Sequence, residues 1–441
     1  MEELKQLMKE AGIVGAGGAG FPSFAKLAEG ADTLVINGAE CEPLLYTDFT
    51  ILGRELPLIV YGATKIVQTL NANRAVLCIK RHRAKELNLT DGEKLADKIT
   101  VKTLPEVYPM GDEVSLIYQA TGKVVKPGAL PITAGVIVYN VETVYNIARA
   151  IKFGDKVTYK WLTISGNVKK PAVVRVPVGT PVRDLFRKLG ITVSEDDCLV
   201  DGGPAMGKIT DLARASVTKT TKSLLVLPES TPAIQYKKLD VSKSIVRAET
   251  ACCQCTHCTE MCPRALLGYP LEPHKLVRTA KSAAEVSPEL VISATLCCGC
   301  GICESIACCQ GISPRAVIDG YKAILAKNKL KFRSDAEVHA KPEHEYRMIP
   351  TTKLMSALGV TKYDVKPEFA GEIKDFNRVE IRLKQHIGAP SVAIVNEGDT
   401  VDAGQKIAES GEGLSLPQYA SISGKVTLID GEKIIIDRVE E

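Results

Sequence analysis

The chain has 441 residues, enough for about three domains that each bury a core of their own. Its 56 basic residues nearly balance its 52 acidic ones, and a formal charge of +4 gives no indication of a nucleic-acid partner or an anionic membrane surface. No apolar run approaches the roughly 18 to 20 residues that span a bilayer, and the charged start lacks the apolar core of a signal peptide. We therefore expect a protein without a transmembrane segment.

The first 150 residues alternate between segments typical of helices and of strands. A helix is expected at the start, where Leu4, Leu7, Met8 and Ala11 share one face. Beyond a glycine-rich loop at 12–22, the apolar stretches 33–36 and 75–79 indicate strands, and the stretch 52–70 indicates a helix between them. Residues 108–150 repeat this order. The alternation predicts an α/β domain.

The glycine-rich loop is weak evidence by itself, because glycines permit close approach of a ligand to the backbone but also form ordinary turns. Three further motifs follow it in order: NGAECEP at 37–43, YPMGDEVSLI at 108–117 and NVET at 140–143. Together with GAGGAGFPSFAKL at 15–27, they resemble the flavin domain of the NADH-oxidising subunit of respiratory complex I and its relatives.

This resemblance implies a set of cofactor-binding residues. Backbone amides of the glycine loop would reach the FMN phosphate, and Lys26 would neutralise it. Asn37 and Asn140 would hydrogen-bond the isoalloxazine or the ribityl chain, and four acids would line the nicotinamide side. The complex I loop carries an acid where this chain has Ala39. The complete set is Gly15, Gly17, Gly18, Gly20, Lys26, Asn37, Glu40, Glu42, Gly111, Asp112, Glu113 and Asn140.

Residues 160–230 change in character. Two short alternating segments precede a helical one, and the stretch ends in DGGPAMG at 201–207. It resembles the β-grasp SLBB domain that follows the flavin domain in the same superfamily, where it is more often a structural spacer than a ligand site. Residues 228–240 are then expected to form a linker.

Eleven of the fourteen cysteines lie between Cys252 and Cys309. The first run has the spacing C-x2-C-x2-C-x3-C-P, with cysteines at 252, 255, 258 and 262. The second has C-x2-C-x2-C, with cysteines at 297, 300 and 303 and a fourth candidate at 308 or 309. Such triplets are typical of [4Fe–4S] clusters. Structural zinc instead uses two separated pairs, and disulfides are spread through small secreted domains. The pattern favours iron–sulfur clusters and a reducing compartment.

The two runs resemble a two-cluster ferredoxin, in which the fourth cysteine of each run binds the other cluster. Carried over, one cluster is held by Cys252, Cys255, Cys258 and Cys308, and the second by Cys297, Cys300, Cys303 and Cys262. Cys309 competes with Cys308, because the second run departs from the ferredoxin pattern at this end. Cys253 and Cys298 are out of register, and His257 and His274 are expected to be structural. Pro263 and Pro314 are expected to begin helices.

The last sixty residues contain short strands punctuated by glycines and resemble a barrel-sandwich domain. No lysine lies between Ile407 and Gly424, where a biotin or lipoate carrier presents one, so a docking or structural module is expected. The predicted α/β multidomain order is a flavin domain at 1–155, an SLBB domain at 156–232, a two-cluster module at 233–325, a connecting segment at 326–378 and the barrel-sandwich domain at 379–441.

Two larger resemblances cover nearly the whole chain. CPRALLGYPLEPHKLVR at 262–278 resembles the Rnf-C proteins of the Rnf complex and the PduS-type cobalamin reductases, and the C-terminal position of the barrel-sandwich domain favours the latter. The resemblance implies that electrons pass from NADH through FMN and two [4Fe–4S] clusters to an acceptor, most simply cobalamin. The alternatives are an Rnf-C-like protein that feeds another reductase, such as proline reductase, a non-catalytic electron relay, and a zinc-stabilised ligand-binding protein.

The same resemblance implies where the protein works. We expect a cytoplasmic protein that is part of a larger assembly, either inside a bacterial microcompartment or peripheral to a membrane complex.

Overall fold

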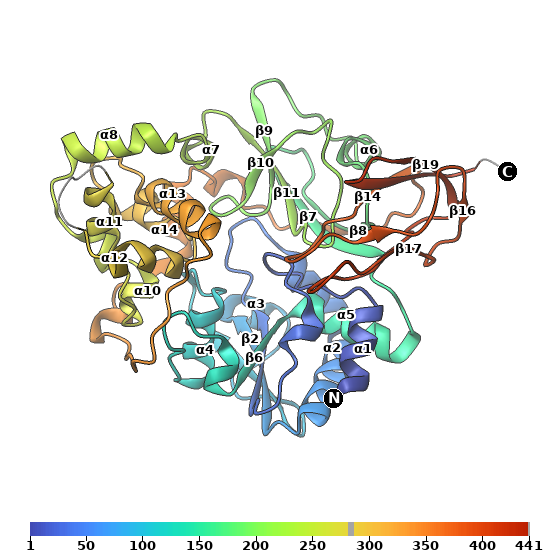
Figure 1. Cartoon of the computed structure of the whole chain (residues 1–441), viewed down its shortest axis with the longest axis horizontal. Helices are drawn as coiled ribbons and strands as arrows, with labels where there is room; N and C mark the ends of the chain where they lie inside the picture. Colours follow the sequence, from blue (N-terminus) through green and yellow to red (C-terminus); the bar gives the residue numbers. More distant parts are fainter. Residues whose placement is uncertain (281–285, 440–441) are drawn as a thin grey trace.

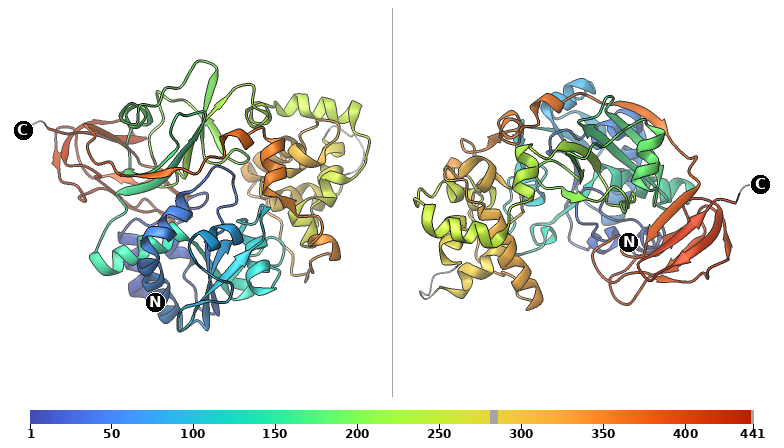
Figure 2. Two further views of the ribbon diagram at one scale, coloured as in Figure 1. Left: turned by 180° about the vertical axis from the view of Figure 1, so that it is seen from behind. Right: turned by 90° about the horizontal axis from the view of Figure 1, so that it is seen from above.

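The structure is a computed structural model that describes residues 1–280 and 286–439. Four parts can be followed in Figure 1 and Figure 2. An N-terminal domain, coloured blue to cyan, lies beside a second, β-rich domain in green. A helical cysteine-rich module and a C-terminal β domain lie at opposite ends of the long axis.

The N-terminal domain is built on a five-stranded sheet. Its strands are β1 (Thr33–Gly38), β2 (Arg74–Lys80), β3 (Lys94–Ala96), β4 (Ile99–Leu104) and β6 (Val136–Asn140). The order is β3-β4-β2-β1-β6, and all neighbours are parallel except β3 and β4. The other elements are α1 (Glu2–Glu10), η1 (Ser23–Lys26), α2 (Thr47–Leu70), α3 (Arg81–Glu86), β5 (Val107–Tyr108), α4 (Glu113–Thr121), η2 (Pro131–Ala134) and α5 (Val141–Phe153).

Alternate residues of β1 are buried in two different cores, as the two-residue period of a strand requires. Leu34 and Ile36 are buried with residues of α2 and α5. Val35 is buried on the other face, with residues of α4 and of the cysteine-rich module. Because both faces are covered, the parallel strands are continuous apolar runs in the sequence. The predicted α/β fold of this domain is confirmed.

The second domain contains a six-stranded sheet of β7 (Tyr159–Gly166), β8 (Ala172–Pro177), β9 (Asp197–Asp201), β10 (Lys208–Thr210), β11 (Ser223–Pro228) and β13 (Glu368–Glu372). The order is β10-β9-β11-β7-β8-β13, and α6 (Val182–Lys188) packs into its core. β13 comes from the segment 326–378, in which the sequence offers no motif, and pairs in parallel with β8. The chain therefore returns to this sheet after the cysteine-rich module.

The cysteine-rich module consists of short helices. They are α8 (Val241–Ala251), α9 (His257–Glu260), α10 (Pro263–Leu266), α11 (Pro273–Thr279), α12 (Pro288–Ser293), η3 (Ala294–Leu296), η4 (Cys303–Ala307) and α13 (Pro314–Lys327), preceded by α7 (Pro232–Lys237). Pro263 and Pro314 occupy first-turn positions, as predicted. The module shares an apolar core with the N-terminal domain, to which Cys262 and Leu267 contribute.

The chain then passes back along the N-terminal domain. The elements there are η5 (Pro342–His344), β12 (Ile349–Pro350), which pairs with β5, α14 (Thr351–Ala357) and η6 (Thr361–Tyr363). The C-terminal domain holds two small sheets, made of β14 (Arg378–Arg382), β15 (Val392–Ala393), β16 (Thr400–Val401), β17 (Lys406–Glu409), β18 (Gln418–Tyr419), β19 (Gly424–Ile429) and β20 (Lys433–Asp437). Among the described residues, every helix is too short or too polar to cross a membrane.

Candidate functional site

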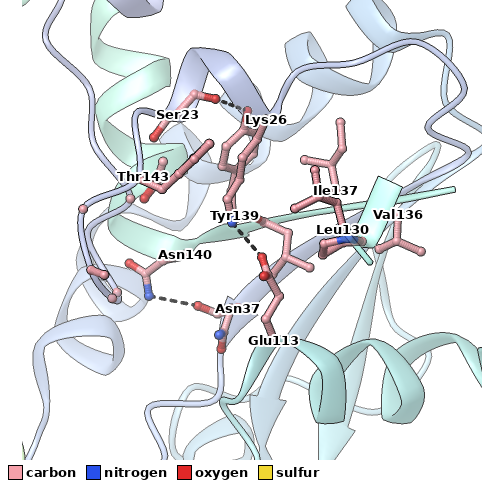
Figure 3. A pocket seen from close by; sticks show the side chains of 18 of the residues that line it. Ser23, Lys26, Asn37, Glu113, Leu130, Val136, Ile137, Tyr139, Asn140 and Thr143 are labelled. Atoms are coloured by element: carbon pink, nitrogen blue, oxygen red, sulfur yellow. Dashed lines mark hydrogen bonds and ion pairs between the residues drawn. The ribbon is translucent and has the colours of Figure 1, made fainter. Parts of the chain in front are cut away.

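A cavity of about 420 Å³ lies where β1 and β6 end, beside the glycine loop (Figure 3). This volume is in the range of cofactor pockets, and the end of a central parallel strand is where α/β domains commonly bind ligands. Nine of the twelve cofactor-binding residues predicted from the sequence line it: Gly15, Gly17, Gly18, Gly20, Lys26, Asn37, Gly111, Glu113 and Asn140.

Two asparagines hold the ends of the central strands together. The Asn37 side chain donates to the carbonyl of Gly111 at 3.1 Å. The Asn140 side chain donates to the carbonyl of Asn37 at 3.2 Å and to the carboxylate of Asp48 at 2.8 Å, and it accepts from the amide of Glu142 at the start of α5. Both amides therefore fix the backbone around the cavity as well as facing it.

Lys26 places a cation at the cavity wall. Its Nζ donates to Glu113 at 2.6 Å and to the carbonyl of Val138 at 3.3 Å. The lysine and glutamate side chains are 29% and 37% exposed, so water and small anions reach the pair. An ammonium at the edge of a glycine loop suits a phosphate group.

Ser23 and Gly18 test whether a phosphate-bearing cofactor fits. The Ser23 hydroxyl is fully buried, lines the cavity and has no hydrogen-bond partner among the described residues. A Cβ on Gly18 would meet no atom within 4 Å, whereas one on Gly17 would approach Asn140 Nδ2 at 2.9 Å. A free hydroxyl and an open backbone face fit FMN, because a buried polar group otherwise lacks a partner. Sequence reasoning missed Ser23, although it lies inside the loop motif.

Thr143 is a second residue that the sequence reasoning missed. Its hydroxyl accepts from the amide of Ala16 at 3.0 Å and so fixes the glycine loop against α5. The NVET motif contains this threonine, and its place in that motif was the available signal.

Three of the four predicted acids lie outside the cavity lining, at contacts between parts of the chain. Glu40 accepts from the amides of Asp48 and Phe49 at the start of α2, and burial beside Asp48 raises its pKa to about 7. Glu42 accepts from two amides of the DGGPAMG loop in the second domain, at 2.7 and 3.0 Å, and burial raises its pKa.

The third acid, Asp112, caps α4 through Ser115 and pairs with Arg264 of the cysteine-rich module at 2.6 Å. Its carboxylate is therefore committed to a contact between two parts of the chain. In this structure, Glu113 is the predicted acid that faces the cavity.

A group of buried charges joins the N-terminal domain to the second domain beneath Asn140. Asp48 pairs with Lys222, and Glu142 pairs with Lys160. Lys222 also lies 4.0 Å from Glu142, which links the two pairs. Burial lowers the pKa of Lys160, and its partner carboxylate opposes that shift. These pairs hold the second domain against the loop that carries the cavity.

The first cysteine group surrounds a small cavity lined by Cys252, Cys255, Cys258 and Cys308, together with Cys253 and Cys309. Burial and the neighbouring thiols raise the pKa of Cys258 to about 12, as expected when several sulfurs converge without a cation between them. Cys308 Sγ accepts from the amide of Ile312 at 3.3 Å, a contact typical of cluster sulfurs. Cys309 is exposed, so Cys308 is the better candidate ligand.

The second group consists of Cys262, Cys297, Cys300 and Cys303. Burial raises the pKa of Cys303, and the nearby Cys297 and Cys262 add to that shift. Burial likewise raises the pKa of Cys262 to about 12. The last cysteine of the first run thus lies among those of the second run, as crossed ligation requires, and the donor set fits a cubane cluster.

The second group is the one adjacent to the N-terminal domain. The Tyr108 hydroxyl donates to the carbonyl of Cys300 at 2.8 Å, and Tyr108 is fully buried. The loop that begins at Tyr108 continues to Gly111, which lines the cavity. In contrast, Cys255 of the first group is exposed. The order from inside to outside is therefore cavity, second cysteine group, first cysteine group, solvent.

Comparisons with known proteins agree with this arrangement. Four family models match: the Nuo51 FMN-binding domain over residues 8–149, the SLBB domain over 162–207, the 4Fe-4S dicluster domain over 251–313 and the RnfC barrel sandwich hybrid domain over 362–437. The predicted cofactors, FMN and [4Fe–4S] clusters, are confirmed.

Similar proteins extend over the whole chain. The cobalamin reductase PduS of Salmonella typhimurium is 37% identical over 438 residues, which are 99% of this chain and 97% of that protein. Its counterpart from Citrobacter freundii is 36% identical over 439 residues, with the same coverage. The RnfC-type component of the ion-translocating oxidoreductase complex of Rhodobacter capsulatus is 32% identical over 293 residues, 65% of this chain and 54% of that protein.

One solved structure, an NAD⁺-reducing [NiFe]-hydrogenase, has a TM-score of 0.45 and 18% identity, covering 79% of this chain and 63% of that chain. The predicted NADH-dependent oxidoreductase with FMN and iron–sulfur clusters is confirmed by the family model of the flavin domain and the full-length relatives. By its full-length similarity, the chain belongs to the family of the PduS cobalamin reductases.

Proposed function

We propose that this chain passes electrons from NADH to cobalamin, with FMN in the cavity beside the glycine loop and a [4Fe–4S] cluster at each cysteine group. The observation that carries the proposal is the order of the sites, from the cavity through the buried cysteine group to the exposed one. Cobalamin as the acceptor rests on the full-length similarity to PduS. Bound FMN supplies the exchange between two-electron and one-electron chemistry.

The residues around the cavity bind and orient the cofactor. Backbone amides of the glycine loop, the Ser23 hydroxyl and the Lys26 ammonium form a polar end that suits the phosphate. Leu130 and Ile132 in and beside η2 supply an apolar wall. The Asn37 and Asn140 amides keep the strand ends at fixed separation, so a flat ring is held in one position.

The contact between the N-terminal domain and the cysteine-rich module holds the two redox sites at fixed separation. Arg264 follows Cys262 closely in the sequence and pairs with Asp112, and Tyr108 contacts Cys300. The apolar residues around these contacts exclude water from the buried cysteine group. A fixed, dry contact favours transfer of an electron within the chain over its loss to solvent.

The test uses anaerobic protein loaded with FMN, iron and sulfide. NADH is expected to bleach the flavin absorbance and then to convert cob(III)alamin into cob(II)alamin, read by its spectrum. The variant Lys26→Ala should lose bound FMN and with it the activity, whereas Lys85→Ala, at an exposed lysine of α3, should retain both. An unchanged flavin spectrum after NADH addition would sink the proposal and leave the electron relay.

A second candidate function is that of an electron-transfer component that feeds another reductase. The similarity to the RnfC-type component of the ion-translocating oxidoreductase complex over 65% of this chain favours it. Under this function, NADH reduces the flavin and an artificial acceptor such as ferricyanide, but cobalamin reduction is no faster than with free reduced flavin. The comparison of the two acceptors separates the candidates.

The surroundings of the protein follow from the same relatives. We propose that it works in the cytoplasm within a larger assembly, either in a bacterial microcompartment or at the surface of a membrane complex. Purification of the tagged chain from its source, followed by identification of co-purifying proteins, tests this: shell proteins support the first assembly, and membrane oxidoreductase components support the second.

A further inference from the structure

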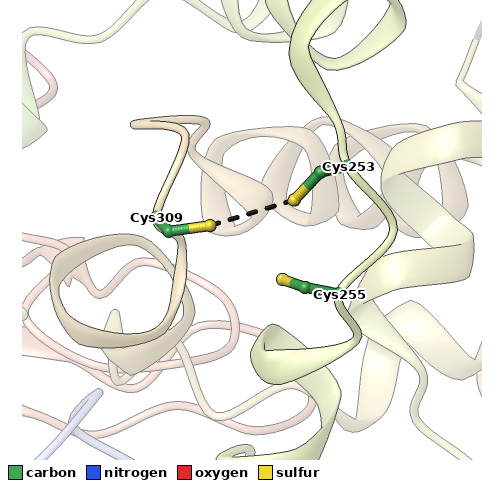
Figure 4. A group of neighbouring side chains, drawn as sticks. All are labelled: Cys253, Cys255 and Cys309. Carbon is green, nitrogen blue, oxygen red and sulfur yellow. Dashed lines mark hydrogen bonds between the residues drawn. The ribbon is translucent and has the colours of Figure 1, made fainter.

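Two exposed thiols lie beside the first cysteine group without belonging to either ligand set. Cys253 and Cys309 each follow a candidate ligand, Cys252 and Cys308 respectively, in the sequence. Their Sγ atoms are 3.9 Å apart, although the residues are 56 positions apart in the chain. Figure 4 shows the two side chains pointing toward each other from different segments, with Cys255 below them.

A metal ion is one explanation for this grouping. The sulfurs of Cys253, Cys255 and Cys309 lie within 4.8 Å of one another, close enough to share an ion. However, Cys255 is a ligand of the proposed cluster, and its removal from the set leaves two thiolates. Structural zinc requires four protein ligands, so two sulfurs are too few. The remaining chemistry of two adjacent, exposed thiols is disulfide formation.

We propose that Cys253 and Cys309 are a modification site that forms a reversible disulfide across the mouth of the first cluster site. The proposal rests on the ligand assignment in the proposed function. The co-reactant is a low-molecular-mass disulfide. One thiolate attacks it and releases one small thiol, and the second cysteine then displaces the other small thiol. Two protein thiols are oxidised to one disulfide, the small disulfide is reduced to two thiols, and no other electron acceptor is needed.

The backbone allows the sulfurs to meet. A disulfide requires them to approach to about 2.05 Å, a movement of about 2 Å from the present distance. Cys253 lies in the segment between α8 and α9, and Cys309 lies in the turn between η4 and α13, so neither is held inside a regular element. Side-chain rotation and small shifts of these loops are sufficient.

The position of the bond gives it a consequence. Cys253 and Cys309 both line the cavity of the first cysteine group, and all three thiols of the grouping are exposed. A disulfide would tie the two cysteine runs together on the solvent side of Cys255. That is the side on which electrons leave the protein in the proposed order, so the oxidised pair stands between the cluster and its acceptor.

The experiment counts thiols in the cluster-loaded protein. Anaerobic holoprotein is incubated with glutathione disulfide, unfolded in acid with an excess of alkylating reagent, and weighed by mass spectrometry. We expect two fewer alkylated thiols than in untreated protein and no added glutathione. Cys253→Ser and Cys309→Ser should each abolish this loss, and Cys198→Ser, at a distant cysteine on β9, should leave it unchanged.

Three results would overturn the inference. One is an unchanged thiol count in the wild type, and another is the same loss in Cys253→Ser. The third is a loss of iron in Cys309→Ser, which would make Cys309 a ligand and leave the proposed function intact. Failure of the proposed function is seen separately, because it appears as absent flavin bleaching or absent iron in the wild type before any oxidant is added.

Discussion

Arg264 of the cysteine-rich module donates to Asp112 of the N-terminal domain at 2.6 Å, and their side chains are only 14% and 10% exposed. The pair lies beside Cys262 in the sequence and beside Gly111, which lines the cavity. It is therefore a direct connection between the two redox sites, and its removal tests how firmly they are held together.

The variant Arg264→Ala should lower the free energy of unfolding by about 3 kcal/mol, because it leaves the Asp112 carboxylate buried without its partner. Denaturant unfolding measures this. Lys275→Ala removes an exposed pair with Glu272 in the same module and should cost less than about 1 kcal/mol. Equal losses in the two variants would show that the Arg264 pair is not buried in solution.

The glycine loop allows a test that separates folding from cofactor binding. Gly18→Ala should leave stability unchanged, since the added Cβ meets no protein atom, but should weaken FMN binding about tenfold, or about 1.4 kcal/mol. Gly17→Ala should destabilise the protein itself, because its Cβ approaches Asn140. Flavin fluorescence titration and thermal unfolding measure the two effects. Unchanged FMN affinity in Gly18→Ala would place the phosphate elsewhere.

Ser23→Ala removes a buried hydroxyl that has no protein partner. We expect the protein without flavin to gain about 1 kcal/mol of stability and FMN affinity to fall about fivefold, because the hydroxyl serves the ligand. Ser223→Ala is the matched control, since Ser223 on β11 is also buried and unpartnered but lies away from the cavity. It should raise stability alone. The reverse pattern would remove Ser23 from the flavin site.

The ambiguity between Cys308 and Cys309 has a direct test. Cys308→Ser should reduce the iron content of the reconstituted protein to about half, because one of two clusters loses a ligand. Cys309→Ser should retain all of it. Iron analysis and the visible absorbance of the clusters measure the outcome, and a halved content in Cys309→Ser instead would exchange the two assignments.

Lys219 predicts a dependence of stability on pH. Its ammonium is buried between the carbonyls of Gly12 and Pro417, and burial lowers its pKa from 10.5 to about 7. Above about pH 7 the unfolded chain therefore binds more protons than the folded one. The free energy of unfolding should rise with pH, by up to about 1.4 kcal/mol per pH unit between about pH 7 and pH 10.

Lys219→Met should flatten this rise, whereas Lys208→Met, at an exposed lysine of β10, should preserve it. Urea unfolding at a series of pH values measures the difference. Parallel curves for the wild type and Lys219→Met would show that the ammonium keeps its proton throughout.

Local patterns were sufficient to predict the domain types and most of the cavity. The loop at 15–27 and the end of β6 meet because parallel strands end at one edge of the sheet, a property of the fold class. The roles of Glu42 and Asp112 could not be predicted this way. Glu42 binds amides 163 and 164 positions away, and Asp112 pairs with a residue 152 positions away. Such partners depend on how domains pack, which no local spacing encodes.

The same limit applies to β13 and to Ser23. β13 is a short segment of mixed polarity, and its pairing with β8 requires the chain to return after nearly 200 residues. Serine occurs in many loops, and only the arrangement of its neighbours shows that the Ser23 hydroxyl has no protein partner. In both cases the identity of the residues permits the structure without requiring it.

The return of the chain to β13 bears on how the protein is assembled in the cell. Because β11 ends at Pro228 and β13 begins at Glu368, the cysteine-rich module is an insertion between two strands of one sheet. The entropic cost of closing such a long loop grows only with the logarithm of its length. The sheet can therefore form while the insertion is still without iron, and biogenesis can proceed in two stages, with metal delivered to a scaffold that has already folded.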